Sequence, residues 1–407
     1  MAQSEKHTPK KAGDLDPDFA NNGRIIVSDL GHAKVAIEDE GGIVYVVNVS
    51  KECRLRRAFA DGSPDLSFGV NGAVTWQFER GETSLAFQLL RQQDGKLLVM
   101  GISQKTIFMW RTAITRFHPN GSPDLIFGTR FLPFPEDPEH VRMGLFEPTA
   151  RLQVDGRILL VSNYQVVDEH GDSIYQAGRL HRLNDDGSPD LTFGVRGYID
   201  VRVNGQDTEV RSIAVLQDQK IIVGTTLNRV LGHEANSRAS LACYMRNGRL
   251  DQGFGKSGYW EESIFSHAYK MIVHENRIIV LGTHLRPSEK SLVLVTRLTA
   301  EGLLDPTFNN ATTLLIDLDQ VANYPEVLSV QSDGKIILAV TTYEGQWWPH
   351  LIRVKNEGVL DEEFGDQGIV KYGEGSVGDG FIQSNTQRII MVHMADAYSS
   401  FILGIQS

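Results

Sequence analysis

Short runs of alternating apolar and polar residues, each ending near a glycine-containing turn, recur along the whole chain. The first four runs are residues 24–28, 33–37, 43–49 and 54–59, and the next four are residues 73–78, 85–90, 96–101 and 112–117. Alternation with a period of two is typical of half-buried β-strands. No window has the 3.6-residue spacing of a long helix, so the pattern predicts an all-β protein.

A motif of the form G-x-x-D-x-x-F separates successive groups of four predicted strands. It occurs seven times, with its aspartates at Asp16, Asp65, Asp124, Asp190, Asp251, Asp305 and Asp361. Starting each unit at its motif glycine divides the chain into residues 13–61, 62–120, 121–186, 187–247, 248–301, 302–357 and 358–407. Four-stranded antiparallel sheets repeated at this period predict a seven-bladed β-propeller, formed by residues 13–407 as a single domain after a flexible tail of residues 1–12.

The strand order within a unit predicts how the ring closes. We name the four strands of each unit a to d in chain order. If strand b is innermost, strand a of the next unit forms the outer edge of each blade. Residues 24–28 then pair with the C-terminal strand at residues 401–405, which leaves no open sheet edge. The b–c connection reads Asp-Gly-Lys or Asp-Gly-Arg in three units, as at Asp94-Gly95-Lys96, and this is the chemistry of a tight hairpin turn.

Residues that recur in every unit are expected to serve folding, which every blade shares. An aspartate in the motif turn can accept a backbone N–H bond from two residues further on, and the motif phenylalanine can pack between neighbouring blades. Five units also carry an arginine five residues before the motif glycine, namely Arg57, Arg116, Arg182, Arg297 and Arg353. We predict that these arginines form either a partly buried ion pair, with the motif aspartate as the partner, or a clamp on backbone carbonyl groups.

The repeat resembles that of the bacterial Delta-60 repeat proteins. The segments that carry the likeness include Gly-Arg-Leu-Asp at 248–251 with Phe254 and Gly255, and Gly-Lys-Leu-Leu-Val-Met-Gly at 95–101. The likeness extends over nearly the whole chain. It implies a β-propeller with seven blades, and it implies no set of catalytic residues.

The charge balance narrows the class of partner. The 407 residues contain 40 Lys and Arg against 51 Asp and Glu, a formal net charge of -11. Such a chain lacks the basic surface expected of a protein that binds nucleic acid or an anionic membrane. The first twelve residues are polar, which predicts a cytoplasmic protein and leaves export without a signal peptide open.

Nothing in the sequence indicates a cofactor or a metal. Cys53 and Cys243 are far apart and have no partner at zinc-ligand spacing, so inert thiols are expected. Asp14, Asp16 and Asp18 resemble the start of a calcium loop. The other six copies of the motif lack this pattern, and an ordinary turn is therefore favoured.

Binding is expected on one face of the ring. The a–b and c–d connections emerge on the same face, and they vary in length and composition at residues 133–144, 163–177, 228–238 and 343–349. Variable loops on a rigid scaffold commonly carry recognition. We call this side the variable-loop face.

Polar residues near the start of the b strands are expected at the mouth of a central channel. This set comprises His32, Lys34, Glu147, Glu209, Arg211, His267, Glu326 and Asp379. Histidine and carboxylate side chains perform acid–base and metal chemistry, so the set is a candidate catalytic site. A hydrated channel lined by unconstrained polar side chains is the simpler interpretation, and we favour it.

Aromatic residues in two c–d connections form the candidate binding set. Phe108 and Trp110 belong to the second unit, whereas Tyr343, Trp347, Trp348 and His350 belong to the sixth. An exposed tryptophan offers a large apolar surface for stacking on a sugar or for protein contact. Packing over the top of the blade as local core is the alternative.

The sequence therefore predicts a non-catalytic propeller that binds a protein, or less favourably a glycan, through its variable-loop face. An enzyme, either a lyase or a hydrolase with its site at the channel mouth, is the second hypothesis. A purely structural module within a larger assembly is the third.

Overall fold

A computed structural model describes residues 11–27, 31–106, 109–133, 140–143, 147–228, 236–286, 289–396 and 399–407. The first ten residues of the predicted tail lie outside this set, as do Phe108 of the aromatic set and parts of the loops at residues 133–144 and 228–238. All bounds given below refer to the described residues.

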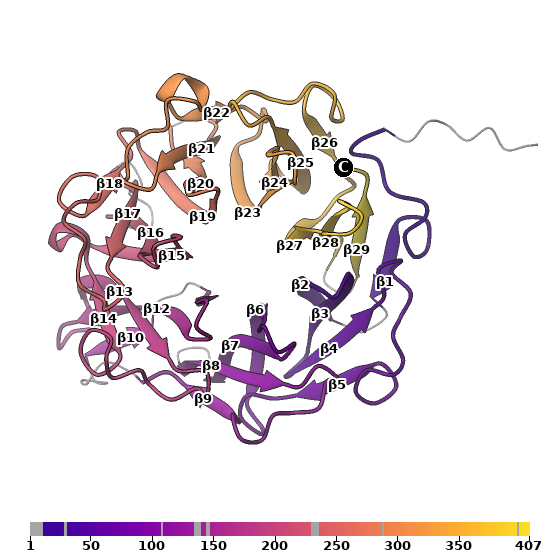
Figure 1. Cartoon of the computed structure of the whole chain (residues 1–407), viewed down its shortest axis with the longest axis horizontal. Coiled ribbons are helices and arrows are strands. Elements are labelled where there is room, and N and C mark those ends of the chain that lie inside the picture. The colour runs from indigo at the N-terminus through magenta and orange to yellow at the C-terminus, as the bar shows by residue number, and fades with distance from the viewer. Residues whose placement is uncertain are drawn as a thin grey trace, which may run out of the picture.

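Seven antiparallel sheets form a ring of blades around a common axis (Figure 1). From the innermost to the outermost strand, blade 1 is β2 (His32–Asp39), β3 (Gly42–Val49), β4 (Glu52–Ala58) and β5 (Ala73–Trp76). Blade 2 is β6 (Thr83–Arg91), β7 (Leu97–Thr106), β8 (Met109–Phe117) and β9 (Thr129–Phe131). Blade 3 is β11 (Thr149–Leu152), β12 (Ile158–Val167), β13 (Ser173–Leu183) and β14 (Tyr198–Val201), and β10 (Val141–Met143) also pairs with β12.

The remaining four blades follow the same order of strands. Blade 4 is β15 (Thr208–Val215), β16 (Ile221–Leu227), β17 (Arg238–Tyr244) and β18 (Tyr259–Glu261). Blade 5 is β19 (Ser266–His274), β20 (Arg277–His284), β21 (Leu292–Thr299) and β22 (Leu314–Ile316). Blade 6 is β23 (Ala322–Val330), β24 (Ile336–Tyr343), β25 (Trp347–Val354) and β26 (Ile369–Lys371). Blade 7 is β27 (Ser376–Ile382), β28 (Ile389–Met394), β29 (Ser400–Ile405) and β1 (Arg24–Val27).

The predicted seven-bladed ring and its closure are confirmed. Each sheet takes its outermost strand from the next unit of the chain, so strand a lies at the rim and strand b lies at the channel. β1 pairs with β29 in antiparallel register, with Arg24 opposite Leu403 and Val27 opposite Ser400 (Figure 1). The last blade therefore joins both ends of the chain, and its outer edge is covered.

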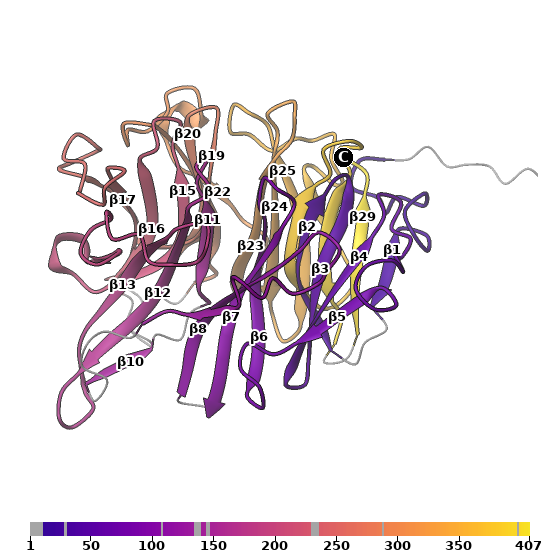
Figure 2. The ribbon, with the colours of Figure 1, turned by 60° about the horizontal axis from the view of Figure 1, so that its bottom comes forward.

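Two segments predicted as long loops extend the sheets instead. Of residues 163–177, only 168–172 lie between β12 and β13, and of residues 343–349, only 344–346 lie between β24 and β25. Figure 2 shows the β12–β13 and β7–β8 hairpins projecting from the same face of the ring. These segments carry β-branched and aromatic residues, which continue a ladder once the neighbouring strand is extended as well.

The motif residues form the contacts between blades. All seven motif phenylalanines are buried. Each packs against the motif glycine of the following unit, and a Cβ atom on Gly302 would lie only 2.7 Å from the Phe254 ring. Gly302 also has a φ of +78°, so close approach and backbone conformation both require glycine there.

Both interactions predicted for the recurring arginines occur, because each arginine pairs with a motif aspartate and four of the five also donate a hydrogen bond to a backbone carbonyl group. Arg182 Nε lies 2.8 Å from Asp190 Oδ2, both side chains are buried, and the Arg182 guanidinium lies 4.5 Å from the centre of the Phe193 ring. The same pairing and stacking occur at Arg57, Arg116, Arg297 and Arg353, although Arg57 is only partly buried. Each unit with this arginine therefore stacks a cation on the phenylalanine that seals the blade contact.

Two units without this arginine receive their cation from the b–c turn. Lys220, directly before β16, lies 3.1 Å from Asp251, and Arg388, directly before β28, lies 2.7 Å from Asp16. The pair between Arg388 and Asp16 links the two ends of the chain. The motif aspartate is thus matched by a basic residue even where strand d lacks one.

Candidate functional site

A β-bulge interrupts the innermost strand of six blades at the same level of the ring. The pairing between the first two strands of the blade shifts between Ala33 and Val35, Ala86 and Gln88, Val210 and Ser212, Ala268 and Lys270, Pro325 and Val327, and Val377 and Gly380. The extra residues are Lys34, Phe87, Arg211, Tyr269, Glu326, and Gly378 with Asp379. A bulge redirects side chains that regular pairing would hold in place.

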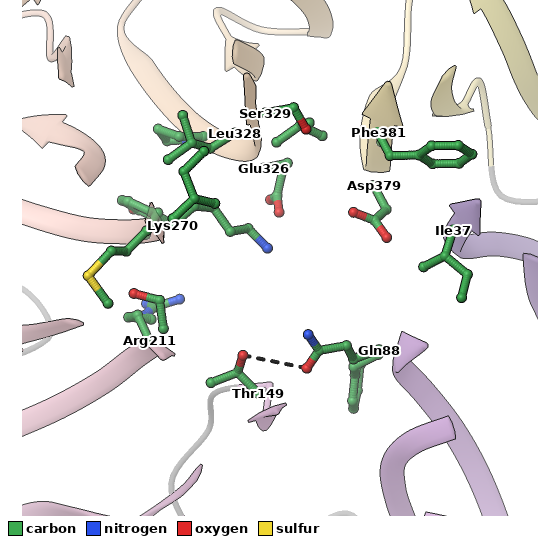
Figure 3. Close-up of a pocket in the computed structure, with 18 of the residues that line it drawn as sticks. Ile37, Gln88, Thr149, Arg211, Lys270, Glu326, Leu328, Ser329, Asp379 and Phe381 are labelled. Carbon is green, nitrogen blue, oxygen red and sulfur yellow. Dashed lines mark hydrogen bonds between the residues drawn. The ribbon is translucent and has the colours of Figure 1, made fainter. Parts of the chain in front are cut away.

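All of these bulge residues line one cavity of about 810 Å³ at the centre of the ring. Blade 3 contributes Glu147, Thr149 and Arg151 to the same wall, so every blade takes part. Figure 3 shows Lys270, Glu326 and Asp379 directed toward the open centre, with Gln88 and Thr149 on the opposite wall. The volume lies within the ~300–1,000 Å³ range of ligand-binding pockets.

Opposite charges face one another across this cavity. The Lys34 ammonium lies 3.0 Å from a Glu147 carboxylate oxygen, which links blade 1 to blade 3 across the channel. Lys270, Glu326 and Asp379 interact through their charges, but among the described residues no ion pair within 4.0 Å joins this lysine to either carboxylate. The centre of the cavity therefore has room between groups that attract one another.

Burial dominates the ionisation of the two central carboxyl groups. It raises the pKa of Glu326, although Lys270 and Lys34 act in the opposite direction. It also raises the pKa of Asp379, against the same two lysines and backbone N–H bonds from Gly380 and Ala36. For Lys34, burial favours the neutral amine, but Glu147, Glu326 and Asp379 together hold its pKa above the ordinary value.

An exposed aromatic cluster adjoins the cavity. It consists of Tyr324, Tyr343 and Trp347, whose exposed fractions are 36%, 39% and 44%. The Trp347 ring centre lies 5.4 Å from that of Tyr324 and 4.7 Å from that of Tyr343. Tyr324 is also part of the cavity wall, so the aromatic cluster and the charged channel form one continuous surface.

The structure divides the predicted channel set into two groups. Lys34, Glu147, Arg211, Glu326 and Asp379 line the cavity. His32, Glu209 and His267 do not belong to its wall, and each lies two residues before the bulged position of its strand. Glu209 is buried against Arg211, and His267 is buried near the Tyr269 ring.

The predicted aromatic set is also divided. Tyr343 and Trp347 belong to the exposed cluster, whereas Trp348 lies under the Lys371 ammonium, 4.0 Å from its ring centre. His350 is buried, and burial lowers its pKa to about 4. Trp110 lies in β8 of blade 2, apart from the cluster in blade 6.

Sequence reasoning missed Lys270, Tyr324 and Gln88. Strict alternation places Lys270 on the opposite side of the strand from Tyr269, but the bulge brings both residues to the cavity wall. Gln88 directly follows its bulge in the same way. The available signal was the cluster of polar residues at one level of each b strand, which does not by itself reveal a bulge.

The described residues contain no group of three or more His, Cys, Asp or Glu side chains that could hold a metal ion. Within the same residues, no helix has the length and apolar character needed to cross a membrane.

Two segments of the chain match a known protein family. Residues 92–127 and 331–364 match a domain of unknown function, DUF5122, that is described as a beta-propeller. No curated protein matches the chain in sequence.

Solved structures share the fold at low sequence identity. The Cps50 (Swd1) β-propeller domain of Myceliophteria thermophila matches with a TM-score of 0.51 at 9% identity, over 94% of this chain and 99% of that one. Raptor of Chaetomium thermophilum matches with a TM-score of 0.53 at 10% identity, over 97% of this chain but 29% of Raptor. A polysaccharide lyase, the ulvan lyase of family PL25, matches with a TM-score of 0.50 at 9% identity, over 97% and 96% of the two chains. These likenesses show a propeller fold, which binding scaffolds and enzymes both use.

Proposed function

We propose that this protein is a non-catalytic binding module that holds its partner on the variable-loop face, at the mouth of the central channel. The observation that carries the proposal is the position of Tyr324. This residue contacts Trp347 in the exposed aromatic cluster and also forms part of the cavity wall. A partner seated on the cluster could therefore extend one group into the channel.

The exposed aromatic rings of this surface suit more than one class of partner. The sequence favoured a protein over a glycan, and propellers such as Raptor and Cps50 (Swd1) share the fold without indicating a partner for this chain. Both kinds of partner can use exposed aromatic rings. As part of the same proposal, we assign the chain to the Delta-60 repeat proteins, which its repeat resembles. This assignment does not identify the partner.

Catalysis in the channel is the second candidate, and the two central carboxyl groups favour it. Carboxyl groups with raised pKa values that face lysines are candidates for acid–base work. The ulvan lyase shows that an enzyme can have this fold. The histidines that suggested catalysis in the sequence stand outside the cavity wall, which weakens the original form of that hypothesis.

A site-specific photo-crosslinker tests the binding proposal in cells that produce the protein. We place a benzophenone amino acid at position 347 and, as a control, at position 59, because Phe59 is 54% exposed and lies on a d–a connection of the opposite face. We expect a discrete covalent adduct, to polypeptide or glycan, from position 347 and none from position 59. No adduct at position 347, or the same adduct at both positions, would contradict the proposal.

A further inference from the structure

We infer that the channel mouth binds a neutral, hydroxyl-rich carbohydrate, with one sugar inside the cavity and the next stacked on the aromatic cluster. This inference rests on the proposed function and names the ligand class for that site. It places Lys270, Glu326 and Asp379 around the inner sugar and Trp347 beside the outer one.

The charges of the cavity wall favour a neutral ligand. Among the described residues, four cationic side chains line the cavity, and two of them are paired, Lys34 with Glu147 and Arg211 with Glu209. The other two, Arg151 and Lys270, balance the carboxyl groups of Glu326 and Asp379, so a ligand of either charge would meet groups of its own sign. Two like charges that lie close together in a binding site lower the affinity, most of all where water is partly excluded. A molecule without net charge avoids both penalties.

The hydrogen-bonding groups of the wall favour hydroxyls. Lysine donates hydrogen bonds only, an ionised carboxylate only accepts them, and a hydroxyl group does both. Several hydroxyls on one ring can therefore bridge Lys270 to Glu326 and to Asp379, which no direct ion pair within 4.0 Å does among the described residues. On the opposite wall, the Gln88 amide donates to the Ala150 carbonyl and accepts from the Ala150 N–H and the Thr149 hydroxyl, so blade 3 holds this polar side chain in place (Figure 3).

The aromatic cluster supplies the apolar part of the site. Its Tyr324–Trp347 and Tyr343–Trp347 ring pairs are tilted by 51° and 49°, so the rings form an uneven surface rather than a flat stack. The C–H face of a sugar can pack on such rings while its hydroxyls stay hydrated. With only the described residues present, more than a third of each of these side chains is exposed to a partner.

The order of these two regions along the surface indicates that the ligand is an oligosaccharide and not a monosaccharide. Tyr324 marks the boundary, with the aromatic cluster on one side and the charged wall on the other. A monosaccharide could use only one of the two regions. A linear oligosaccharide that enters by its end uses both.

A glycan array of neutral, acidic and basic oligosaccharides, probed with the fluorescently labelled full-length protein, tests the ligand class directly. We expect binding to neutral linear oligosaccharides of two or more residues. Binding only to acidic glycans, only to basic glycans, or to no glycan would overturn the inference. If position 347 still crosslinks to a polypeptide in that case, the binding proposal stands and only the carbohydrate assignment falls.

Calorimetric titration with the strongest neutral array ligand then tests the placement. We expect Trp347→Ala and Tyr343→Ala each to weaken affinity at least about tenfold, as for buried aromatic contacts in binding sites. Phe59→Ala, on the opposite face, should leave affinity unchanged. The placement would be overturned if Phe59→Ala weakened affinity as much as the cluster variants do, or if neither cluster variant weakened it.

The inner sugar is tested by Glu326→Gln, which keeps the shape of the side chain but removes its charge and replaces one acceptor oxygen by an NH2 donor. Circular dichroism and thermal unfolding first establish that the variant is folded. We expect it to lose affinity for the disaccharide and for longer chains alike, because the same inner sugar is bound in each. Unchanged affinity for every chain length would show that no sugar enters the cavity.

Discussion

At the scale of single residues, most charged side chains of the channel depend on the one or two extra residues in each bulged strand. Without its bulge, β19 would direct Tyr269 and Lys270 to opposite sides by alternation, whereas both now line the cavity. The sequence could identify Glu326 and Asp379 as polar residues near the channel. It could not identify Lys270, because a bulge follows from pairing between strands and leaves no pattern within one strand.

The pH dependence of stability should reveal the burial of Glu326. Its raised pKa means that the folded state keeps this proton to a higher pH than the unfolded chain does. The carboxyl group therefore lowers the free energy of unfolding once the pH rises above the ordinary pKa of glutamate, about 4.3. The full loss applies above the raised pKa of the folded state. Glu326→Gln carries no such cost, so its melting temperature relative to the natural protein should rise from pH 4 to pH 8.

Differential scanning calorimetry across this pH range measures the effect. The exposed Glu362 provides a matched control as Glu362→Gln. A Glu326→Gln protein that is less stable relative to the natural protein at pH 8 than at pH 4 would mean that attraction to Lys270 and Lys34 outweighs burial.

At the scale of elements, the repeated motif explains why the blades could be predicted so completely. The same glycine, aspartate and phenylalanine return in every unit, so a recurring contact such as the one between Arg182 and Asp190 is visible as a recurring pair of letters. Basic residues that replace the recurring arginine from another position of the unit are harder to recognise in the sequence. Lys220 serves Asp251 from the b–c turn, which the sequence suggested only as a hairpin signal. Strand extensions such as the β12–β13 hairpin were also not predicted, since each extension occurs in its own unit and does not repeat from unit to unit.

Removing one motif phenylalanine should destabilise the ring strongly. Phe193 is fully buried between blades and packs under Arg182, so Phe193→Ala leaves a cavity and an unsupported guanidinium. We expect a loss of ~3–5 kcal/mol in the free energy of unfolding, measured by urea denaturation. Leu191→Ala is the control, because Leu191 is in the same loop and 73% exposed, and it should change stability by less than about 0.5 kcal/mol. Similar losses in both variants would contradict a special role of the buried ring.

At the scale of the whole molecule, the two ends of the chain complete one blade. β1 covers the edge of β29, Asp16 pairs with Arg388, and Phe19 packs against Gly404. Counting seven units and assigning strand a to the preceding blade was enough to predict this closure. The site on the ring could be predicted only in part, because Tyr324, Tyr343 and Trp347 come together through the pairing of three strands.

Removing residues 1–27 should open the ring at a defined place. The deletion takes away β1 and Phe19, so β29 presents an unpaired edge and the last blade loses a buried ring. Loss of one buried phenylalanine alone costs ~3–5 kcal/mol, and an uncovered strand edge promotes pairing with another chain. We expect a lower melting temperature and concentration-dependent association, measured by calorimetry and by size-exclusion chromatography with light scattering. Ile26→Thr keeps the β1–β29 backbone pairing and alters a side chain that is mostly exposed, so it should remain as stable and as monodisperse as the natural protein. A deletion variant that matched it in both measurements would show that closure contributes little to the integrity of the ring.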